Sequence, residues 1–429
     1  MSLVALSHRN FRLLWLGQLI SFSGSVMMTA AILWHVSLLV APDDKALALG
    51  LVGLVRVGPI IAFSLISGVA ADALDRRRLM MVTQSASMAI SLVLAMLTLR
   101  GLSVVWPIYA LSALASSVSA FDLPARQALI PTLVPRQHLA NALSLNQIMF
   151  QTAAVTGPAL GGLVIANFGV AGVYILDAVS FLCVLIALAM MRDVSEVQAH
   201  ERAALSFASA REGLRFVFTA PIIRSTMLLD FVATLFASAT ALLPIFAQDI
   251  LDVGAAGYGW LYAAPATGSL LTSALLVRTI EHIKRRGPTL LWSVGLYGVS
   301  TILFGLSRDF WVSFVCLAFT GAADTVSTVL RGVIRQLETP DRLRGRMTGV
   351  NMIFFLGGPQ LGELEAGLVA HWLSAPISVV TGGLGTIVAT AAIAARTPAL
   401  RRYRRGEAGV AAWDSGERSK LASKSAGPS

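Results

Sequence analysis

The sequence predicts an all-α membrane protein with twelve transmembrane helices in two pseudo-symmetric six-helix bundles. Composition gives the class: of 429 residues, 56% are hydrophobic and only 13% are charged, whereas soluble domains carry about 25% charged residues. Repetition gives the number of helices, because apolar runs near the roughly 20 residues needed to span a bilayer recur along almost the whole chain. The fold class follows from these two observations and from an internal repeat.

Polar breaks divide the chain into twelve expected spans. They cover residues 13–40, 47–70, 79–99, 103–121, 141–166, 171–191, 225–247, 256–278, 288–307, 310–332, 347–372 and 375–395. The longest hydrophilic insert separates six spans from six, and its apolar and arginine-bearing faces predict an amphipathic helix at the membrane interface. The expected domains are a six-helix bundle, a cytoplasmic linker, a second six-helix bundle and a basic tail, at residues 1–191, 192–224, 225–396 and 397–429.

The positive charges predict the orientation. If the N-terminus is cytoplasmic, 29 of the 33 Lys and Arg residues belong to cytoplasmic segments. The outside loops hold only Lys45, Arg100 and Arg308, and Arg56 lies within a span. Because Lys and Arg favour the cytoplasmic side, both termini are expected there. The net charge of +10 then follows from topology, and no nucleic-acid partner is expected.

The two halves contain a repeated motif. "GPALGGL" at residues 157–163 recurs as "GPQLGEL" at residues 358–364, each after a segment that contains Asp, Arg, Pro and Leu in the same order. Parallel six-helix repeats are a known transporter architecture. Glycines four apart allow close helix contact, and an internal proline bends a helix, which suits either rocking domains or plain packing. The packing candidates are Gly157, Pro158, Gly161, Gly358, Pro359 and Gly362.

A short loop carries the first family resemblance. "GVAADALDRRRLM" at residues 68–80 resembles the signature of the major facilitator superfamily between its second and third helices, although Ala73 and Asp75 depart from it. The resemblance implies the major facilitator fold and a gating loop that contacts neighbouring helices and stabilises a closed state. From the residues alone, a topogenic charge cluster is the alternative. The matching positions are Gly68, Asp72, Arg76 and Arg77.

Further motifs narrow the branch. "GPALGG" resembles the antiporter motif of drug exporters, and "DLPARQALIPTLV", "DTVSTVLRG" and "LGELEAG" are similar to the bacterial branch of enterobactin-exporter-like and drug-efflux proteins. The arginine-containing signature that many drug antiporters carry inside helix four is missing. The resemblance also implies that helices one, four, seven and ten line a central cavity.

Ionised side chains at helix centres cost about 2.5–3.5 kcal/mol and are functional candidates by default. Glu363 and Glu365 lie about 200° apart around a helix, so both cannot line one cavity. Because burial disfavours the charged form of a carboxyl, either is a candidate to exchange a proton. Permanently hydrogen-bonded structural acids are the alternative. The proton-coupling candidates are Asp324, Glu363, Glu365, Asp230 and Asp177.

Polar residues at helical spacing along the first span, beside aromatic residues, suit an adaptable ligand cavity. Hydrogen bonding between helices is the alternative. Asp122 and Arg126 are instead predicted to form a local ion pair that orders a loop. The cavity or substrate candidates are Gln18, Ser21, Phe22, Ser25, Thr29, Arg56, Gln147 and Gln151.

These observations favour a proton-coupled exporter of an amphipathic small molecule, a drug or a siderophore, that works by alternating access. The alternatives are an importer or facilitator of a small polar solute on the same fold, and a membrane enzyme or receptor. The last is disfavoured because the chain has no H-E-x-x-H, G-x-S-x-G or P-loop pattern. We expect a monomer whose partners are substrate, protons and the lipid bilayer. No cofactor or metal is expected, and Cys183 and Cys316 are predicted to be small buried residues.

Overall fold

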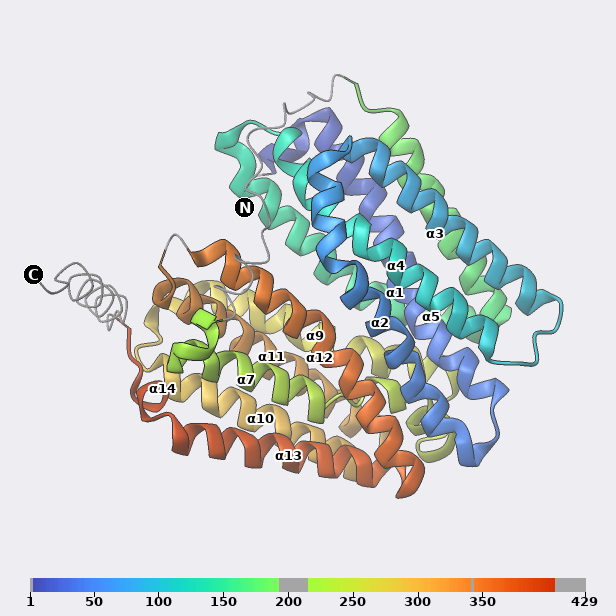
Figure 1. Ribbon diagram of the computed structural model, residues 1–429. Helices are drawn as coiled ribbons and strands as arrows, with labels where there is room; N and C mark the ends of the chain where they lie inside the picture. Colours follow the sequence, from blue (N-terminus) through green and yellow to red (C-terminus); the bar gives the residue numbers. More distant parts are fainter. Residues whose placement is uncertain (1–2, 193–214, 341–342, 406–429) are drawn as a thin grey trace, which may run out of the picture.

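The computed structural model describes residues 3–192, 215–340 and 343–405, and this part of the chain is almost entirely helical (Figure 1). The side chains of residues 64–66, 68–73, 344–346, 348–350 and 352–356 also lie outside the description. The expected amphipathic helix and the end of the basic tail fall mostly on residues that are not described.

Eleven long helices carry the fold in the described residues. The first half contains α1 (Arg9–Leu39), α2 (Lys45–Ala73), α3 (Arg76–Leu99), α4 (Trp106–Leu129) and α5 (Leu139–Ala189). The second half contains α7 (Pro221–Phe236), α9 (Gly254–Thr279), α10 (Arg286–Leu306), α11 (Phe310–Glu338), α12 (Arg344–Trp372) and α13 (Ala375–Arg396). The short α8 (Leu243–Ile245) and α14 (Pro398–Arg402) complete the second half.

The described helices agree with the twelve expected spans. In the part of the chain that the structure describes, ten helical segments are long and apolar enough to cross a membrane. One of these segments, α5, covers both the fifth and the sixth expected spans, because Gly169 (φ 71°, ψ 179°) interrupts the helix between them. That backbone conformation is easily adopted only by glycine. The remaining expected span, the eleventh, is covered by α12, which is 29 residues long.

Two helix boundaries differ from the expectation. The seventh span, expected as one run over 225–247, is broken: α7 ends at Phe236, and a 3-10 turn, α8 and a π-helix follow from residue 240 to residue 250. Pro244 has no N–H to donate to the preceding turn. The carbonyl of Ala237, the residue after α7, accepts from Ala239 N at 3.0 Å and from the Tyr297 hydroxyl at 3.2 Å. The fourth span, expected to end at residue 121, continues through Pro124 to Leu129.

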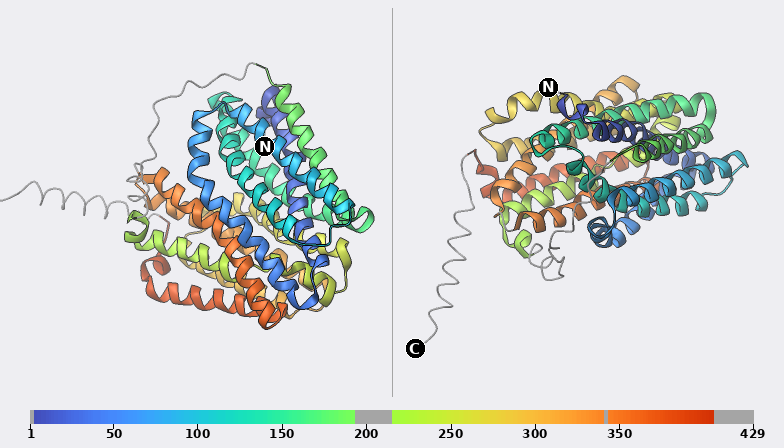
Figure 2. Two further views of the ribbon diagram at one scale, coloured as in Figure 1. Left: turned by 45° about the vertical axis from the view of Figure 1, so that its right-hand side comes forward. Right: turned by 90° about the horizontal axis from the view of Figure 1, so that it is seen from above.

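The helices form two bundles that meet mainly through two pairs, α2 with α12 and α5 with α9 (Figure 1, Figure 2). Gly50 lies against Gly367, and Gly162 against Gly259, so the backbones touch directly. These contacts lie toward one end of the molecule, here called the loop end. Its turns cover residues 40–44, 100–105, 251–253, 307–309 and 373–374. The opposite end, the terminal end, has its turns at residues 74–75, 130–138, 280–285 and 397.

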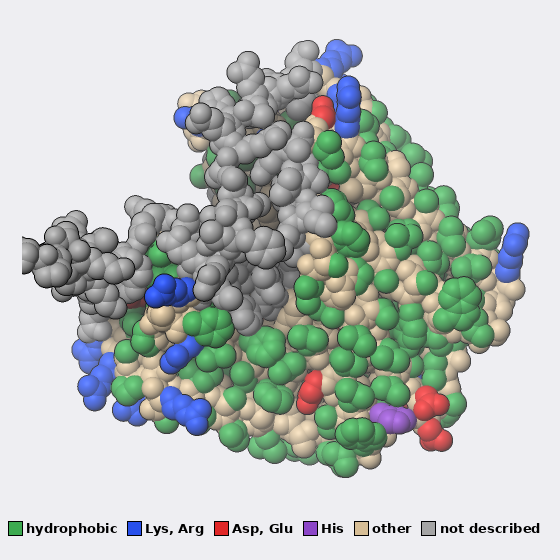
Figure 3. Space-filling model, in the orientation of Figure 1, with side chains coloured by type: hydrophobic (Ala, Val, Ile, Leu, Met, Phe, Trp, Pro, Cys, Tyr) green, Lys and Arg blue, Asp and Glu red, His purple; other side chains and the backbone are tan. Residues whose placement is uncertain are grey.

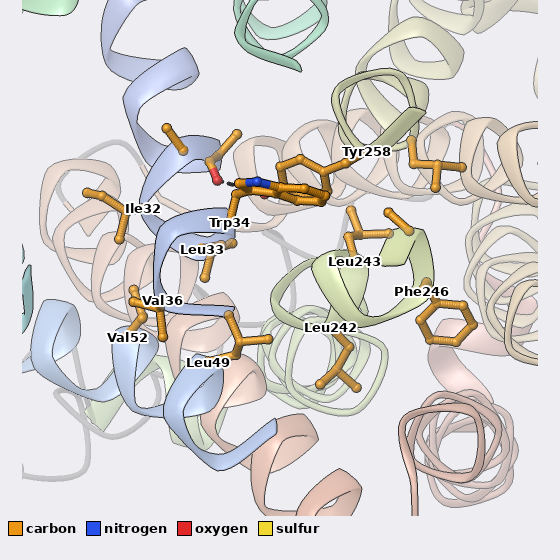
Figure 4. Packing of buried hydrophobic residues seen from close by; sticks show 14 of the residues in the cluster. Ile32, Leu33, Trp34, Val36, Leu49, Val52, Leu242, Leu243, Phe246 and Tyr258 are labelled. Carbon is orange, nitrogen blue, oxygen red and sulfur yellow. Dashed lines mark hydrogen bonds between the residues drawn. The ribbon is translucent and has the colours of Figure 1, made fainter. Parts of the chain in front are cut away.

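The largest hydrophobic cluster crosses the boundary between the bundles at the loop end. Figure 4 shows Leu33 and Trp34 of α1 beside Leu243 and Tyr258 of the second bundle. The Tyr258 hydroxyl donates to the Ala30 carbonyl at 2.8 Å, which ties the bundles together.

The outer surface is apolar between its two ends. Figure 3 shows a broad hydrophobic band with most Lys and Arg side chains gathered at the margins of the view. Large apolar side chains such as Trp292 and Val277 are 80% and 77% exposed. A continuous apolar surface of this extent is typical of contact with lipid.

Candidate functional site

A cavity of about 310 Å³ lies among α1, α2, α3 and α4. Its wall is rich in hydroxyl and amide groups and also contains two arginines, Arg56 and Arg126. Among the described residues of the second bundle, Gln360 of α12 is the one that lines it. The polar residues expected along the first span line this cavity, namely Gln18, Ser21, Ser25 and Thr29, together with Phe22.

Arg126 is the centre of a buried cluster in this cavity. Its Nη2 lies 3.3 Å from Asp122 Oδ2, and its Nη1 donates to Gln18 Oε1 at 3.0 Å. The guanidinium also lies 5.7 Å and 5.1 Å from the ring centroids of Phe22 and Phe150. Both distances fall within the range of cation–π attraction. The cluster therefore holds the guanidinium in place with one carboxylate, one amide and two rings.

Asp122 is held from α3 as well. Its Oδ1 accepts from Thr83 Oγ1 at 3.0 Å and from Gln84 Nε2 at 2.8 Å. Asp122 and Arg126 are only 7% exposed each. The expected loop-ordering ion pair is therefore formed, but it lies inside the lengthened α4 and lines the cavity. The expected location in a loop was wrong because the fourth span was expected to end at residue 121, before Asp122 and Arg126.

A second cavity, of about 260 Å³, lies in the other bundle. Its wall contains Tyr262, Tyr297 and Asp324, the broken segment after α7, and Gln151 from the first bundle. The side chain of Asp324 is 46% exposed. This cavity therefore presents a carboxyl and phenolic hydroxyls where the first presents guanidinium groups.

Behind Asp324 lies a buried ion-pair network. Arg331 Nη2 lies 2.9 Å from Asp230 Oδ1 and 3.5 Å from Asp324 Oδ1, and it donates to Thr328 at 2.8 Å. Arg335 lies 3.9 Å from the other Asp230 oxygen. Asp230 thus joins α7 to α11, and both of its oxygens face arginines. A carboxylate held in this way is less suited to carrying a proton than a free carboxyl.

The remaining acids line neither cavity. Asp177 is fully buried and accepts from Ser91 Oγ at 2.6 Å. Glu363 is 6% exposed and lies beside Gly53 at the α2–α12 contact. Within the part of the chain that the structure describes, its Oε2 has no hydrogen-bond partner. Glu365, on another face of α12, is partly exposed. Among the described residues, no cluster of three or more His, Cys, Asp or Glu could hold a metal ion.

Ser25 and Thr29 bond within α1 while lining the cavity. Each hydroxyl donates to the carbonyl one turn earlier, at 3.1 Å and 2.9 Å. Gln151 lines the second cavity. Gln147 is exposed and lines neither.

The expected gating loop is described only in part. The side chains of Gly68 and Asp72 lie outside the description. Arg76 Nη1 donates to the Ala128 carbonyl at 3.0 Å, and Arg77 Nε donates to the Leu188 carbonyl at 2.8 Å. These carbonyls lie in the last turns of α4 and α5, where no intrahelical donor remains. The two arginines therefore tie the loop to two helix C-termini.

The repeated glycines occupy equivalent contacts in the two bundles. Gly157 and Gly161 of α5 lie against Ser23 and Met27 of α1. In the second bundle, Gly358 and Gly362 of α12 lie against Thr234 of α7. Pro158 and Pro359 lie inside the same two helices.

The sequence interpretation missed Asp122 and Arg126 as cavity residues. The signal was present: the "DLPAR" segment of α4 corresponds in the repeat to the segment that begins at Asp324 of α11. It also missed the glycines of the contact between bundles, such as Gly50 and Gly367, because they belong to no repeated motif.

Known proteins resemble the chain over nearly its full length. It is 26% identical over 410 residues to a protein of Shigella boydii named enterobactin exporter, with 95% of this chain and 97% of that one covered. A protein of the same name in Escherichia coli O1:K1 is 25% identical to this chain over 410 residues.

Solved structures show the same fold. A POT family transporter in complex with a thioalcohol-conjugated peptide matches with a TM-score of 0.73 at 12% identity, covering 91% of this chain and 96% of that one. A bacterial homologue of the lysosomal transporter Spinster, in an inward-facing conformation, matches with a TM-score of 0.70 at 15% identity, covering 93% and 99%. The family model described as transmembrane secretion effector matches residues 1–425. The chain therefore belongs to the transmembrane secretion effector family and is a multi-pass membrane transporter with the major facilitator fold.

Proposed function

We propose that this transporter is a proton-coupled exporter of an amphipathic small molecule, a drug or a siderophore, in the bacterial cytoplasmic membrane. It acts as a monomer by alternating access, with both termini in the cytoplasm. The observation that carries the proposal is a polar and aromatic cavity of about 310 Å³ beside bundles that touch mainly at the loop end. A cavity of this size and mixed lining suits a small ligand. The relatives named enterobactin exporters support the outward direction.

The charge pattern supports the orientation. Clusters of arginine and lysine lie at or beside the turns of the terminal end, at residues 76–78, 284–286 and 401–405. The loop end has isolated cations, Lys45, Arg100 and Arg308. Since Lys and Arg are retained on the cytoplasmic side, the loop end faces outward. In this orientation, the contacts between bundles close the outer side.

Proton coupling rests on carboxyl groups inside the helices. Asp324 faces the second cavity, and Glu363 has an unpartnered oxygen at a contact that must open if the bundles rock. A carboxyl that is alternately buried and exposed can exchange a proton between the two sides. An importer or facilitator on the same fold remains the alternative function, and the direction of gradient-driven flux separates the two.

The test is transport in proteoliposomes with an imposed pH gradient and a panel of amphipathic drugs and siderophores. An exporter that exchanges substrate for protons accumulates substrate against its gradient only in vesicles of the matching polarity. Accumulation that ignores the pH gradient would refute the coupling, and uptake in the opposite polarity would favour the importer.

Amide variants locate the coupling site. Glu363→Gln, Glu365→Gln and Asp324→Asn keep the side-chain shape and remove the charge change. The variant at the coupling site should lose gradient-driven transport and keep substrate counterflow, which needs no net proton movement. Glu281→Gln, at an exposed turn of the terminal end, is the matched control. If all three variants keep full gradient-driven transport, none of these acids carries the proton.

A further inference from the structure

Unpartnered polar atoms gather in the wall of the 310 Å³ cavity. Gln18 Nε2 and Arg126 Nε are buried and have no hydrogen-bond partner among the described residues. The orientation of the Gln18 amide is fixed, because its Oε1 already accepts from Arg126, so Nε2 faces away as a donor. Both atoms can only donate. An occupant of this cavity must therefore supply acceptors.

Two other lining atoms lack partners and do not change this conclusion. Ser112 Oγ can donate or accept. Gln360 Oε1, on the second bundle, is an acceptor as placed. Its amide is held by no hydrogen bond that fixes which atom is oxygen, so it can present either group.

The cavity also has an excess of positive charge. Arg126 is matched by Asp122 at 3.3 Å. Arg56 lines the same cavity, and among the described residues its guanidinium has no hydrogen bond and no ion pair. Glu363 interacts electrostatically with Arg56, but it forms no ion pair with Arg56 and does not line the cavity. Arg56 is half-buried, and because a partly desolvated charge without a contact partner is costly, its position favours an anion.

Part of the wall is apolar. Phe22 and Phe181 contribute aromatic rings, and Met28, Ile32 and Ile60 contribute flexible and branched aliphatic groups. Phe22 packs edge-on against Phe150 with ring centroids 4.5 Å apart. Aromatic rings stack well on such a surface.

We infer that this cavity is the substrate site and that it selects organic anions with an aromatic body, such as aryl carboxylates or ionised phenols. The anionic group pairs with Arg56, further acceptors on the molecule take the free donors of Gln18 and Arg126, and the ring lies against Phe22. The inference rests on the proposed transport function for the use of the site, and it adds the charge and shape of the substrate.

Binding of three naphthalene derivatives to the full chain in nanodiscs of zwitterionic lipid tests this inference. The probes are 2-naphthoate, 2-naphthalenemethanol and 2-naphthylmethylamine, which share a ring and differ in charge. Isothermal titration should show naphthoate binding at least tenfold more tightly than either of the others. Tighter binding of the amine, or no binding of naphthoate, would overturn the inference.

Variants assign the selectivity to residues. Arg56→Gln should weaken naphthoate binding at least tenfold and leave the alcohol unchanged. Arg100→Gln, an exposed arginine at the end of α3, is the matched control and should change neither. Arg126→Gln alone would leave the buried Asp122 carboxylate without its ion-pair partner. The double variant Asp122→Asn with Arg126→Gln keeps the cluster neutral, and it should also reduce the preference for anions. Equal naphthoate affinity in Arg56→Gln and wild-type protein would overturn the assignment.

Transport separates this inference from the proposed function. In everted vesicles an exporter moves its substrate from the medium into the lumen. Uptake of neutral or cationic compounds, with no preference for anions and no effect of Arg56→Gln, would refute the anion site and leave the exporter function intact. Absence of transport for every compound, together with anion-selective binding, would refute the exporter and leave the anion site.

Discussion

Gly367 offers the sharpest test of how the two bundles close. A methyl group on Gly367 would lie 2.6 Å from the Cα of Gly50 and 2.7 Å from the carbonyl oxygen of Ala46. Both neighbours are backbone atoms of α2, so no side chain can rotate away. In Gly367→Ala, α2 and α12 must separate at the loop end or accept severe overlap.

The size of the effect follows from this overlap. Overpacking of this kind costs about 1–3 kcal/mol, and each 1.4 kcal/mol changes an equilibrium constant about tenfold. The equilibrium between states closed and open at the loop end should therefore shift about 5- to 150-fold toward the open state. Alanine also favours the helix by about 1 kcal/mol over glycine. That gain is present in both states and does not offset the shift.

Pulsed electron resonance between spin labels at Arg100→Cys and Trp311→Cys measures this shift. These exposed positions lie at the loop end of different bundles and outside the contact itself. Cys183 and Cys316 are first replaced by alanine. The population at longer distance should grow in Gly367→Ala.

Gly58→Ala on α2 is the control, because no atom lies within 4 Å of a methyl group at that position. Its distance distribution should match that of the parent protein. If Gly367→Ala also matches the parent while remaining folded, the direct backbone contact does not hold the loop end closed, and our account of closure is wrong.

Three further predictions concern stability and orientation. Arg331→Met should lower stability by about 3–5 kcal/mol, because it strands the buried Asp230; thermal unfolding in detergent should show this loss and its partial recovery on adding Asp230→Asn. Lys45→Met breaks a 2.9 Å pair with Asp249, whose side chain is 49% exposed, and should cost less than about 1 kcal/mol by the same assay. Reporter fusions at residues 43, 100, 169, 252 and 309 should read as periplasmic and those at 200 and 410 as cytoplasmic; a cytoplasmic signal at 252 would contradict the six-plus-six topology.

The helical membrane fold could be predicted because composition and run length alone determine which segments can span a bilayer. The ends of the helices were harder to predict. The run around residues 225–247 is apolar on average, with Asp230 as its one charged residue, so hydropathy does not reveal the break after Phe236. At the break, the carbonyl of Ala237 accepts from the Tyr297 hydroxyl, sixty positions later in the chain. No local pattern encodes such a partner.

The candidate site was predictable where it follows helical periodicity. The spacing of Gln18, Ser21 and Ser25 is enough to put them on one face of α1, and that face lines the cavity. Their role in binding stays a prediction. Asp122 and Arg126 were placed in a loop because charged residues normally end a span. Their burial depends on donors from α3 and on the two phenylalanine rings, which the sequence does not bring together.

The two bundles use the same helix of the repeat in opposite ways. On α4, Asp122 is engaged by α3 and Arg126 contacts Gln18 and the aromatic pair in its cavity. On α11, Arg331 pairs with Asp230 of α7 at 2.9 Å, and Asp324 is the member that faces its cavity, 46% exposed. One bundle therefore presents guanidinium groups, suited to an anion, and the other presents a carboxyl, suited to a proton.

This asymmetry ranks the acids for coupling. Asp230 is held by two arginines, and Asp177 is fully buried behind Ser91, so neither is readily exposed to solvent. Asp324 needs no rearrangement of the bundles to meet solvent from its cavity, whereas Glu363 needs the α2–α12 contact to open. We therefore expect Asp324→Asn to abolish pH-gradient-driven transport while counterflow and anion binding persist. Loss of coupling in Glu363→Gln, with normal coupling in Asp324→Asn, would instead place proton exchange at the contact between the bundles.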